Sequence, residues 1–485
     1  MATTWQALLI AYLVLEWVLR VVMLFFVPHN RRPSSATAWI LLIMVLPVIG
    51  AILFAMFGNP RLPKNRRDAQ AKIDKLTQKE LETLYLTYPK TFKNLESANS
   101  VTLAKLSHSL GGLPPMHGNT ASFYTGYQEG FDAQLQAVEN AKKYIHIEFF
   151  IFVLDSQTEP LFVAIEKAVA RGVVVRVLFD RFASARYPKY RRMLKRLRTI
   201  GADAHPVLPY RLIPGVNFTR PDLRNHRKII IVDGSVGFSG SQNMVIKNYH
   251  RSDNLVYEEL VMKITGPAVW QLDNVFRADW YAETKNELRD TKDNQKLQSE
   301  TGAVPIQVVP SGPSHIYDNN VLLYASMFHA AKTSIRIVVP YFIPDDSVMI
   351  ALTSAAQRGV KVTMINSEAI DKLLTGHAQR SYYNELLQAG VEIYLYNKPV
   401  FLHTKQVIID DDMAVVGSSN LDIRSFELSL EANIVLYEKN VVSELKRIEQ
   451  NYIKKAHKLT VENWNSRPVH KKLLDNFSRL TASLQ

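Results

Sequence analysis

A pattern of polar residues that occurs twice constrains this chain more than any other feature of its sequence. The first copy runs from His226 to Asn243 and reads His-x-Lys-x4-Asp-x6-Gly-Ser-x-Asn, and the second runs from His403 to Asn420 without a gap. One such match arises by chance in some chains of this size, but two copies with the same downstream residues are not accidental. The repeat therefore predicts one structural unit used twice.

The residues that follow each histidine predict a strand. The runs 229–232 and 406–409 are apolar and rich in β-branched residues, which is typical of buried strands. Because residues two apart on a strand share a face, the histidine and lysine of each copy are expected to point the same way. Asp233 and Asp410 fall on the opposite parity at the strand's end. As motif members they stay among the candidate catalytic residues, although this position suits a turn-former better than a catalyst.

The two motifs lie inside a longer duplication. Residues 141–148 are echoed by 331–338, and residues 170–175 by 357–362, at offsets of 190 and 187 residues that close to 177 at the histidines. Each half therefore predicts a strand, a helix ending at glycine, a strand, a helix and a strand, and each half is expected to supply half of one site.

These residues resemble the phospholipase D superfamily and, within it, the bacterial cardiolipin synthases. The resemblance runs from about residue 33 to the C-terminus and is carried by Arg224–Lys228, Ser311–Pro313, Pro340–Asp345 and Asn420–Leu428. It implies an α/β fold with two pseudo-symmetric phospholipase D-like α-β-α halves packed together. Two departures are a phenylalanine in Glu148-Phe149-Phe150 where tyrosine is common, and Ser429 where asparagine is common. We expect neither departure to touch the chemistry.

Composition narrows the class of partner. The formal charge of +13 favours an anionic partner, either lipid head groups or nucleic acid. The chain has no cysteine, which excludes disulfides and thiolate metal sites. Its 485 residues suffice for two or three domains with cores of their own.

The N-terminal segment decides between those partners in favour of lipid. Ala7–Val27 is an apolar run interrupted by Glu16 and Arg20, and Thr37–Phe57 is a second run of 21 residues without charge. Each is long enough to cross a bilayer core of about 30 Å, so the sequence predicts a pair of membrane helices. Glu16 and Arg20 are spaced i, i+4 and can pair on one face of the first helix.

Basic residues around these runs predict the orientation. Two arginines lie between the runs, and four basic residues follow the second run; they are Arg31, Arg32, Arg61, Lys64, Arg66 and Arg67. The excess after the second run places the catalytic region on the cytoplasmic face of a bacterial cell membrane, as part of a multi-pass protein.

The domain division follows from these features. We expect two transmembrane or membrane-embedded helices over 1–60, a basic and polar helical tether over 61–110, a first phospholipase D-like half over 111–290, and a second half with a helical tail over 291–485. In the tail, the apolar spacing after Val441 predicts packing on the catalytic body.

Two further segments have an expected role. Residues 189–198 predict a basic amphipathic helix, with either a solvated basic face or a membrane contact. The proline-containing loop 210–223 leads to His226 and is a candidate part of the substrate mouth.

The chemistry is expected to use side chains alone, with no cofactor and no metal, because the sequence shows no metal-ligand cluster of convincing spacing and no Walker-type loop. With an ordinary pKa near 6.5, one histidine can attack as the neutral form while its partner acts as an acid. The candidate phosphate-binding residues are Lys228, Lys405, Ser241, Asn243, Ser418 and Asn420.

The resemblance implies roles that spacing does not. Glu431 matches the carboxylate that orients the histidine in the family, and the alignment of the first half points to Glu259, with Glu258 as the alternative. It also implies that His226 is the nucleophile and His403 the acid and base, although the near-symmetric halves do not settle this order.

The predicted function is phosphatidyl transfer in the membrane, in which two phosphatidylglycerol molecules give cardiolipin and glycerol through a phosphatidyl-histidine intermediate. One alternative is a phospholipase D that uses water as acceptor. A metal-independent nuclease would leave the apolar runs unexplained, and an idle scaffold would not keep both motifs. The expected partners are phosphatidylglycerol and the bilayer, with no nucleic acid, and the oligomeric state is unknown.

Overall fold

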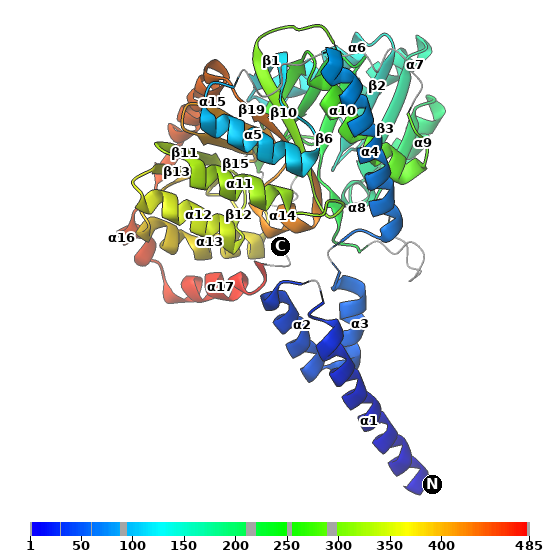
Figure 1. Ribbon diagram of the computed structural model, residues 1–485, viewed down its shortest axis with the longest axis vertical. Helices are drawn as coiled ribbons and strands as arrows, with labels where there is room; N and C mark the ends of the chain where they lie inside the picture. The colour runs from blue at the N-terminus through cyan, green and yellow to red at the C-terminus, as the bar shows by residue number, and fades with distance from the viewer. Residues whose placement is uncertain are drawn as a thin grey trace. The chain divides into compact units, whose positions relative to one another are not determined.

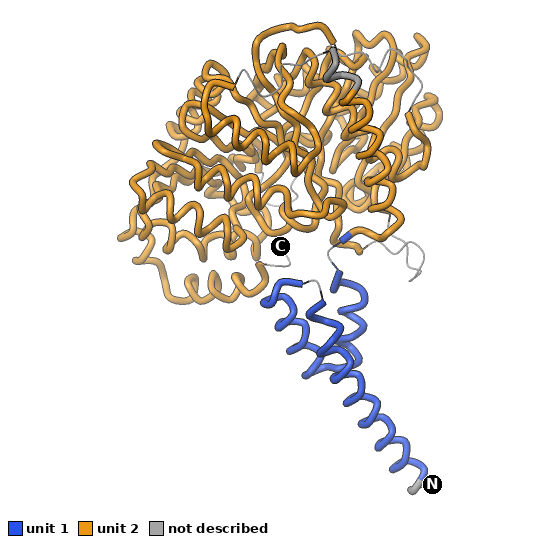
Figure 2. The backbone as a smooth tube through the Cα atoms, viewed as in Figure 1, with its two compact units in different colours: residues 1–61 blue, residues 62–485 orange. Residues whose placement is uncertain are grey.

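The computed structural model describes residues 2–29, 31–59, 61–87, 95–209, 220–249, 255–288 and 298–482. Residues 210–219 of the candidate substrate mouth and the expected boundary at 290 lie outside these ranges. The chain forms two compact units, residues 1–61 and residues 62–485, shown in separate colours in Figure 2.

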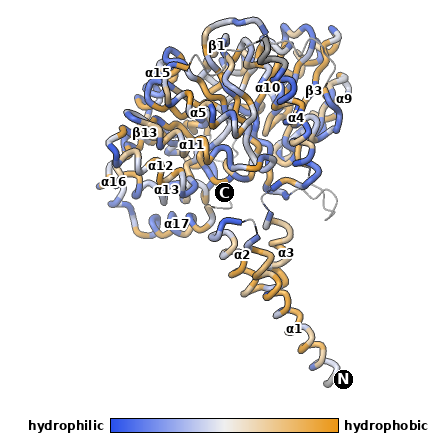
Figure 3. Tube along the Cα trace, viewed as in Figure 1, coloured by the Kyte–Doolittle hydropathy of each residue, from blue (hydrophilic) through white to orange (hydrophobic). Residues whose placement is uncertain are grey.

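The first unit contains one helix long enough to cross a membrane. In α1 (Ala2–Phe26), the stretch Thr4–Phe26 has the length and composition of a membrane span. The carboxylate of Glu16 lies 3.3 Å from the guanidinium of Arg20, which confirms the expected i, i+4 pair. Arg20 also donates a hydrogen bond of 3.3 Å to the carbonyl of Met44. Figure 3 shows how continuous the apolar sequence of this unit is.

The second apolar run is not the single spanning helix expected from the sequence. It forms α2 (Pro33–Val45) and α3 (Pro47–Phe57), with a break at Leu46, whose φ of −128° and ψ of 76° are not helical. Pro47 causes the break, because proline lacks the N–H of a helix interior and disfavours helical geometry in the residue before it. At about 1.5 Å per residue the two helices are roughly 20 and 17 Å long, shorter than a bilayer core.

A glycine lets the two short helices pack closely. A Cβ on Gly50 of α3 would come within 2.9 Å of the Cα of Ile43 in α2. Ile43 and Ala36 are buried against Val27, with Trp39 and Phe54 around them. The first unit is therefore a small helical assembly in which α2 and α3 lie side by side.

The second unit is built on one 16-stranded sheet, and Figure 1 labels most of its elements. Strands β1 (Met116–Tyr124) and β10 (Val304–Ser311) pair antiparallel at its centre. Outward from β1 the order is β9 (Val261–Thr265), β7 (Val236–Gly240), β6 (Lys228–Val232), β2 (Tyr144–Phe149), β3 (Val174–Asp180) and β4 (Asp203–Val207).

The other side of the sheet repeats this order. Outward from β10 lie β19 (Ser429–Leu436), β17 (Met413–Gly417), β16 (Gln406–Ile409), β11 (Ser334–Val338), β13 (Lys361–Ser367) and β14 (Glu392–Tyr396), with β20 (Ala456–Lys458) at the edge. The two halves are thus related by a pseudo-twofold arrangement about the β1–β10 pair, as the duplication predicts.

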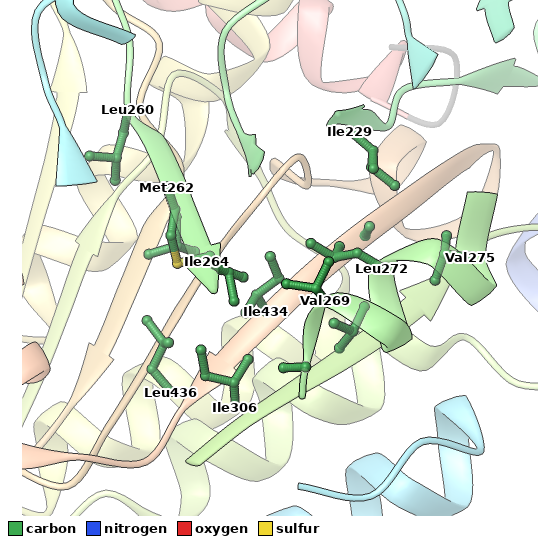
Figure 4. Close-up of a cluster of buried hydrophobic side chains, with 14 of the residues drawn as sticks. Ile229, Leu260, Met262, Ile264, Val269, Leu272, Val275, Ile306, Ile434 and Leu436 are labelled. Carbon is green, nitrogen blue, oxygen red and sulfur yellow. The ribbon is translucent and has the colours of Figure 1, made fainter. Parts of the chain in front are cut away.

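Helices cover both faces of the sheet, which gives each half the expected α-β-α layers. One face carries α6 (Tyr127–Glu139), α7 (Glu159–Ala170) and α9 (Tyr190–Thr199) in the first half, and α11 (Asn319–Ala330), α12 (Asp346–Gln357) and α13 (Leu373–Gln388) in the second. The opposite face carries α10 (Val269–Thr284) and α15 (Lys439–Ile453), whose apolar side chains join one core shared by both halves. Figure 4 shows part of this core, with Val269, Leu272 and Val275 of α10 beside Ile306 and Ile434. The predicted packing of the tail on the catalytic body is therefore confirmed in α15.

The apolar run of the first motif is buried on both sides. Ile229 and Ile231 enter the shared core beneath α10, while Ile230 and Val232 enter the core beneath α6, α7 and α9. Burial of each such side chain contributes roughly 1.5–3 kcal/mol. Because both faces of this strand are covered, every residue of the run is apolar, and apolar and polar residues do not alternate along it.

The segment expected to be a tether packs on the second unit as two helices, α4 (Lys64–Thr87) and α5 (Ala98–Gly111). Arg66 forms a two-pronged ion pair with Glu283 at 2.5 and 2.8 Å. In α5, Leu103 is buried in the core of the second half, and the Gln307 side chain donates to the Ala104 carbonyl at 3.1 Å. These contacts make α4 and α5 part of the catalytic body.

The motif aspartates, predicted among the catalytic residues, bind backbone N–H groups of turns in the structure. Asp233 follows β6 with a φ of 55° and accepts backbone N–H bonds from Lys142, Lys143 and Tyr144 at 2.6–3.0 Å. It lies roughly 17 Å along the strand from Lys228, at about 3.3 Å per residue. Its carboxylate clamps the turn that leads into β2.

Asp410 repeats this arrangement in the second half. Its φ is 51°, and it accepts N–H bonds from Lys332, Thr333 and Ser334 at 2.8–3.0 Å. Burial opposes ionisation of Asp410, but the hydrogen bonds from Ser334 and Thr333 outweigh it and lower the pKa of the carboxyl. Both aspartates are therefore turn-formers.

We predict that Asp410→Ala destabilises the fold by about 3 kcal/mol, because several backbone donors lose a charged acceptor. The stabilisation from this carboxylate is present above its ordinary pKa and is lost as pH falls through the lowered pKa, so the difference between wild type and variant should narrow in acid. Urea unfolding at neutral and acid pH measures both effects. At a permissive temperature the variant should keep turnover within a few-fold of wild type, and a loss as complete as that of His403→Ala would contradict the structural role.

Candidate active site

Two exchanged strand pairs bring the motifs together. The short strand β5 (Arg224–Asn225), just before His226, pairs in parallel with the start of β19 in the other half. Likewise β15 (Val400–Leu402), just before His403, pairs in parallel with β8 (Val256–Glu258) of the first half. Each histidine is thus reached through a strand that is hydrogen-bonded to the opposite half.

The exchange continues into the side chains. The backbone N–H of His226 donates to the Leu430 carbonyl at 2.9 Å, and its Nδ1 lies 2.9 and 3.1 Å from the two carboxylate oxygens of Glu431. His403 donates to the Glu258 carbonyl at 2.8 Å, and its Nδ1 lies 2.9 and 3.0 Å from the carboxylate of Glu259.

Each glutamate therefore orients the histidine of the other half. The sequence analysis assigned Glu259 and Glu431 half by half and did not predict this crossing, because a residue spacing within one half carries no information on the register between halves. Of the two first-half alternatives, the partner of His403 is Glu259, whereas Glu258 contributes its backbone and lies 3.8 Å from Lys455.

The crossed carboxylates fix the protonation of both rings. An ionised carboxylate only accepts hydrogen bonds, so Nδ1 of His226 and of His403 carries the proton that it donates. In the neutral imidazole the lone pair then resides on Nε2. Both histidines therefore have Nε2 as the nitrogen available for chemistry.

The motif lysines are buried and held close to the histidines that precede them. Lys228 donates from Nζ to the His226 carbonyl at 2.6 Å, and Lys405 donates to the His403 carbonyl at 2.8 Å. Burial lowers the pKa of Lys228 to about 7, against the attraction of Glu431. Burial lowers the pKa of Lys405 to about 8, against the attraction of Glu259.

The electrostatics show that the two motifs face one site. Burial lowers the pKa of His226 well below its ordinary value, and the charges of Lys228, Lys405 and His403 act in the same direction. Burial lowers the pKa of His403 to about 4, with Glu259 opposing and the two lysines assisting. Two histidines 177 residues apart in the sequence thus sense the same pair of cations, and both are neutral at pH 7.

The motif serines do not have the phosphate-binding geometry expected of them. Ser418 donates from Oγ to Glu431 at 2.5 Å and accepts the Ala432 N–H at 3.0 Å. Ser241 accepts the N–H of Leu260, the residue after Glu259, at 2.8 Å. Both hydroxyls instead hold the backbone next to an orienting glutamate, and Ser418 also holds the carboxylate itself.

The motif asparagines are buried close by. Asn243 accepts the Ile151 N–H at 3.4 Å and donates to the Tyr249 hydroxyl at 3.5 Å. The backbone N–H of Asn420 donates to Ser425 Oγ at 3.2 Å. Phosphate binding by the two carboxamides stays a prediction.

Aromatic rings contact both histidines. The ring of Phe150 lies 4.8 Å from the His226 ring, edge to face, and Lys228 Nζ lies 5.6 Å from the Phe150 centroid. The ring of Tyr257 lies 5.5 Å from His403 in a similar arrangement. Phe150, in the segment Glu148-Phe149-Phe150, therefore contacts a motif histidine, which the sequence analysis did not predict.

Two charged residues of the site were missed by the sequence analysis. Lys372, at the start of α13, lowers the pKa of both His226 and Lys405 through its charge, and its Nζ lies 4.8 Å from the ring of Tyr341. Arg227 is buried, pairs with Asp279 and donates to the Glu431 carbonyl at 3.1 Å. Arg227 lies between the motif histidine and lysine, and the alternation of side chains along a strand places it on the face opposite to theirs. That pattern alone does not predict its burial. Lys372 lies outside the duplicated pattern, so no repeat points to it.

These features define a class of protein. A duplicated α/β unit whose halves exchange carboxylates aims two histidines beside two buried lysines. Such a site is suited to nucleophilic attack on a phosphodiester, because both imidazoles are neutral and a bound phosphate favours the charged forms of both lysines. The architecture and site are those of the phospholipase D class.

Comparison with protein families agrees with this class and narrows it. Residues 135–280 and 324–453 match the family described as cardiolipin synthase, phospholipase D-like domain, and residues 10–59 match the phospholipase D-nuclease N-terminal family. The chain belongs to the cardiolipin synthase family of the phospholipase D superfamily, as the motifs had suggested.

Relatives match over nearly the whole chain. Cardiolipin synthase 1 of Bacillus cereus is 33% identical over 477 residues, covering 94% of this chain and 90% of its own length. Cardiolipin synthase A of Pectobacterium carotovorum is 31% identical, covering 92% of each. Among solved structures, phosphatidylserine synthase of Haemophilus influenzae has a TM-score of 0.59 at 15% identity, covering 79% of this chain and 98% of that one, and supports the fold alone.

The crossed pairing generates a test by NMR. We predict that Glu431→Gln disturbs the ring-nitrogen signals of His226 and leaves those of His403 nearly unchanged, because only His226 loses its carboxylate. Turnover should fall about 10²-fold or more, since the ring loses both aim and tautomer. Imidazole ¹⁵N spectra and steady-state kinetics measure the two effects. Glu258→Gln is the matched control with little expected change, and a response of His403 to Glu431→Gln would exclude the crossing.

The lowered lysine pKa values predict proton uptake on anion binding. Near pH 8, Lys228 with its pKa of about 7 is mostly neutral and Lys405 is about half charged. A bound anion favours the charged forms and raises both pKa values, so sulfate, which does not itself titrate there, should bind with uptake of about one proton. Calorimetry in buffers of different ionisation enthalpy measures the uptake. Lys228→Arg should reduce it, because arginine is already charged, and no uptake in wild type would contradict the electrostatic argument.

Proposed function

We propose that this chain transfers the phosphatidyl group of one phosphatidylglycerol to the head-group hydroxyl of a second, which produces cardiolipin and releases glycerol. The observation that carries the proposal is the pair of neutral imidazoles, each aimed through Nδ1 by a carboxylate from the opposite half. Similarity to cardiolipin synthases over at least nine-tenths of the chain supports phosphatidylglycerol as the substrate.

In the first step, Nε2 of His226 attacks the phosphorus of the donor lipid. A P–N bond forms, the bond from phosphorus to the glycerol head group breaks, and the departing oxygen takes a proton from His403. Glycerol leaves, and the phosphatidyl group stays on His226 as a covalent intermediate. Glu431 stabilises the positive charge that His226 gains, because it already accepts the Nδ1 proton.

In the second step, His403 acts as the base. It takes the proton from the head-group hydroxyl of the acceptor lipid, whose oxygen then attacks phosphorus while the P–N bond breaks. Cardiolipin forms, His226 is restored, and His403 again holds the proton that it gave to the first glycerol. Two phosphatidylglycerol molecules are thereby converted into cardiolipin and glycerol with no net change in the enzyme.

His403 becomes protonated when the substrate binds. Its pKa of about 4 in the protein alone makes it neutral at pH 7, and the anionic phosphate raises that pKa by adding a negative charge to the site. Lys228 and Lys405 stabilise the non-bridging oxygens, where charge resides in the transition state. Asn243 and Asn420 are proposed to donate to the same oxygens.

The protein is proposed to act at the cytoplasmic face of a bacterial membrane, held there by α1. Its length, its composition and the basic residues that follow the apolar segments support this placement. We also propose that residues 111–290 and 291–485 are the two catalytic halves, consistent with the repeated strand order about β1 and β10.

Purified protein in phosphatidylglycerol vesicles tests the reaction. We expect equimolar cardiolipin and glycerol with little phosphatidic acid, because the second lipid, and not water, accepts the intermediate. Phosphatidic acid as the main product would indicate hydrolysis, and cleavage of DNA without lipid turnover would indicate a nuclease.

Variants and chelation complete this test. His226→Ala and His403→Ala should each abolish turnover, whereas His457→Ala, which changes an exposed histidine bonded to Asn397, should not. EDTA should leave turnover unchanged. Strong inhibition by EDTA that one added metal relieves would refute a reaction run by side chains alone.

A further inference from the structure

Helix α17 (Val469–Arg479), at the C-terminal end of the second unit, packs with its polar side inward. Asp475 and Ser478 are only 2% and 0% exposed. Large apolar residues of the helix, and Leu480 directly after it, face outward, with exposed fractions of 61–79% for Val469, Leu473, Phe477 and Leu480. These four are spaced i, i+4, i+8 and i+11, so they form one continuous stripe on the helix.

Directional bonds hold the helix in this orientation. Asp475 accepts from His377 Nδ1 at 2.7 Å and from Arg467 at 2.7 Å, so its carboxylate is fixed between α13 and the turn before α17. Arg479 lies over the ring of Tyr382, 4.4 Å from its centroid, and 3.6 Å from Glu385. Rotating the helix to bury its apolar stripe would break the hydrogen bonds of Asp475 and leave His377 and Arg467 without their carboxylate partner.

The contrast with α9 shows that this orientation is unusual within the same molecule. Helix α9 is also short and basic, but Met193 and Leu197 are fully buried in the core and its basic residues face outward. That is the ordinary arrangement for a helix on a water-facing surface, and it favours the solvated interpretation of residues 189–198. The outward stripe of α17 therefore points to an apolar partner.

Helix α13, which packs beside α17 as Figure 1 shows, also exposes large apolar residues. Leu373 and Leu374, at the start of α13, are 66% and 46% exposed. They follow Lys372 directly, and the charge of Lys372 reaches His226. We call Leu373, Leu374, Val469, Leu473, Phe477 and Leu480 the α13–α17 surface.

Basic residues beside this surface identify the partner's charge. His470, Lys471 and Lys472 lie within the first turn of α17, and the whole chain carries a formal charge of +13. An apolar stripe with a cationic border matches the boundary between anionic head groups and acyl chains. A second copy of the chain is a poorer match, because a symmetric contact would bring the same cations together.

We propose that the α13–α17 surface inserts into the interface of an anionic phospholipid bilayer and so seats the second unit on the membrane beside its active site. This contact is distinct from α1, and it does not depend on which reaction the two histidines catalyse. It brings Lys372 to the level of the lipid phosphates, where a substrate head group would enter.

The absence of cysteine from the sequence permits a direct test with the full-length chain. A fluorophore is attached to Phe477→Cys on the surface or, as control, to Glu166→Cys on an exposed part of α7. Each protein is reconstituted in vesicles of phosphatidylcholine with phosphatidylglycerol, with nitroxides on the acyl chains of a tracer lipid. We expect the Phe477→Cys probe to be quenched several-fold more than the Glu166→Cys probe.

Two additional measurements separate insertion from other causes. Adding Leu473→Glu, at a residue that is 63% exposed, should return quenching of the Phe477→Cys probe towards the control level without lowering the melting temperature. Omitting phosphatidylglycerol should weaken the quenching. Equal quenching at both probe sites would overturn the proposal, as would energy transfer between Phe477→Cys probes on different chains, which would assign the surface to self-association. None of these readouts requires lipid turnover.

Discussion

The crossed hydrogen bonds between each histidine and a glutamate of the opposite half are the interaction on which the site depends. They require the two halves to meet in one register, which the β1–β10 pair and the exchanged pairs β5–β19 and β8–β15 provide. Neither half can assemble an oriented histidine alone, because its own carboxylate points to the other ring. Duplication alone would give two half-sites, and the exchange makes them one.

The same crossing solves an electrostatic problem. Two buried lysines and two imidazoles would concentrate positive charge, and the cost of burial appears in the lowered pKa values of all four groups. Glu259 offsets part of this cost for His403 and for Lys405, and Glu431 offsets part of it for Lys228. The site therefore stays folded with neutral imidazoles and lysines that an anion can readily charge, which is the state needed to receive a phosphodiester.

What the sequence could predict divides along physical lines. The run Ile229–Val232 predicted its strand because burial on both faces leaves a local pattern, and the repeated spacing predicted the duplicated fold. The crossed glutamates, the role of Ser418 and the burial of Arg227 depend on contacts between distant segments, which local spacing does not encode. The break in the second apolar run is different, because Pro47 itself indicates a helix interruption, whereas the hydropathy of residues 37–57 indicates only their apolar character.

Exact symmetry would make the two histidines equivalent, and the residues beside them show that they are not. On the first side Arg227 pairs with Asp279 and holds the Glu431 backbone, whereas the matching residue Thr404 contacts the Tyr452 hydroxyl at 3.1 Å and brings no charge. The His226 side chain is also more exposed than that of His403, at 14% against 6%. A nucleophile must reach phosphorus and stay neutral, so the more accessible ring, whose carboxylate strand is tied down by an arginine, suits that role. The neighbours of the motif thus favour His226 as the nucleophile, a distinction that the repeated motif alone does not make.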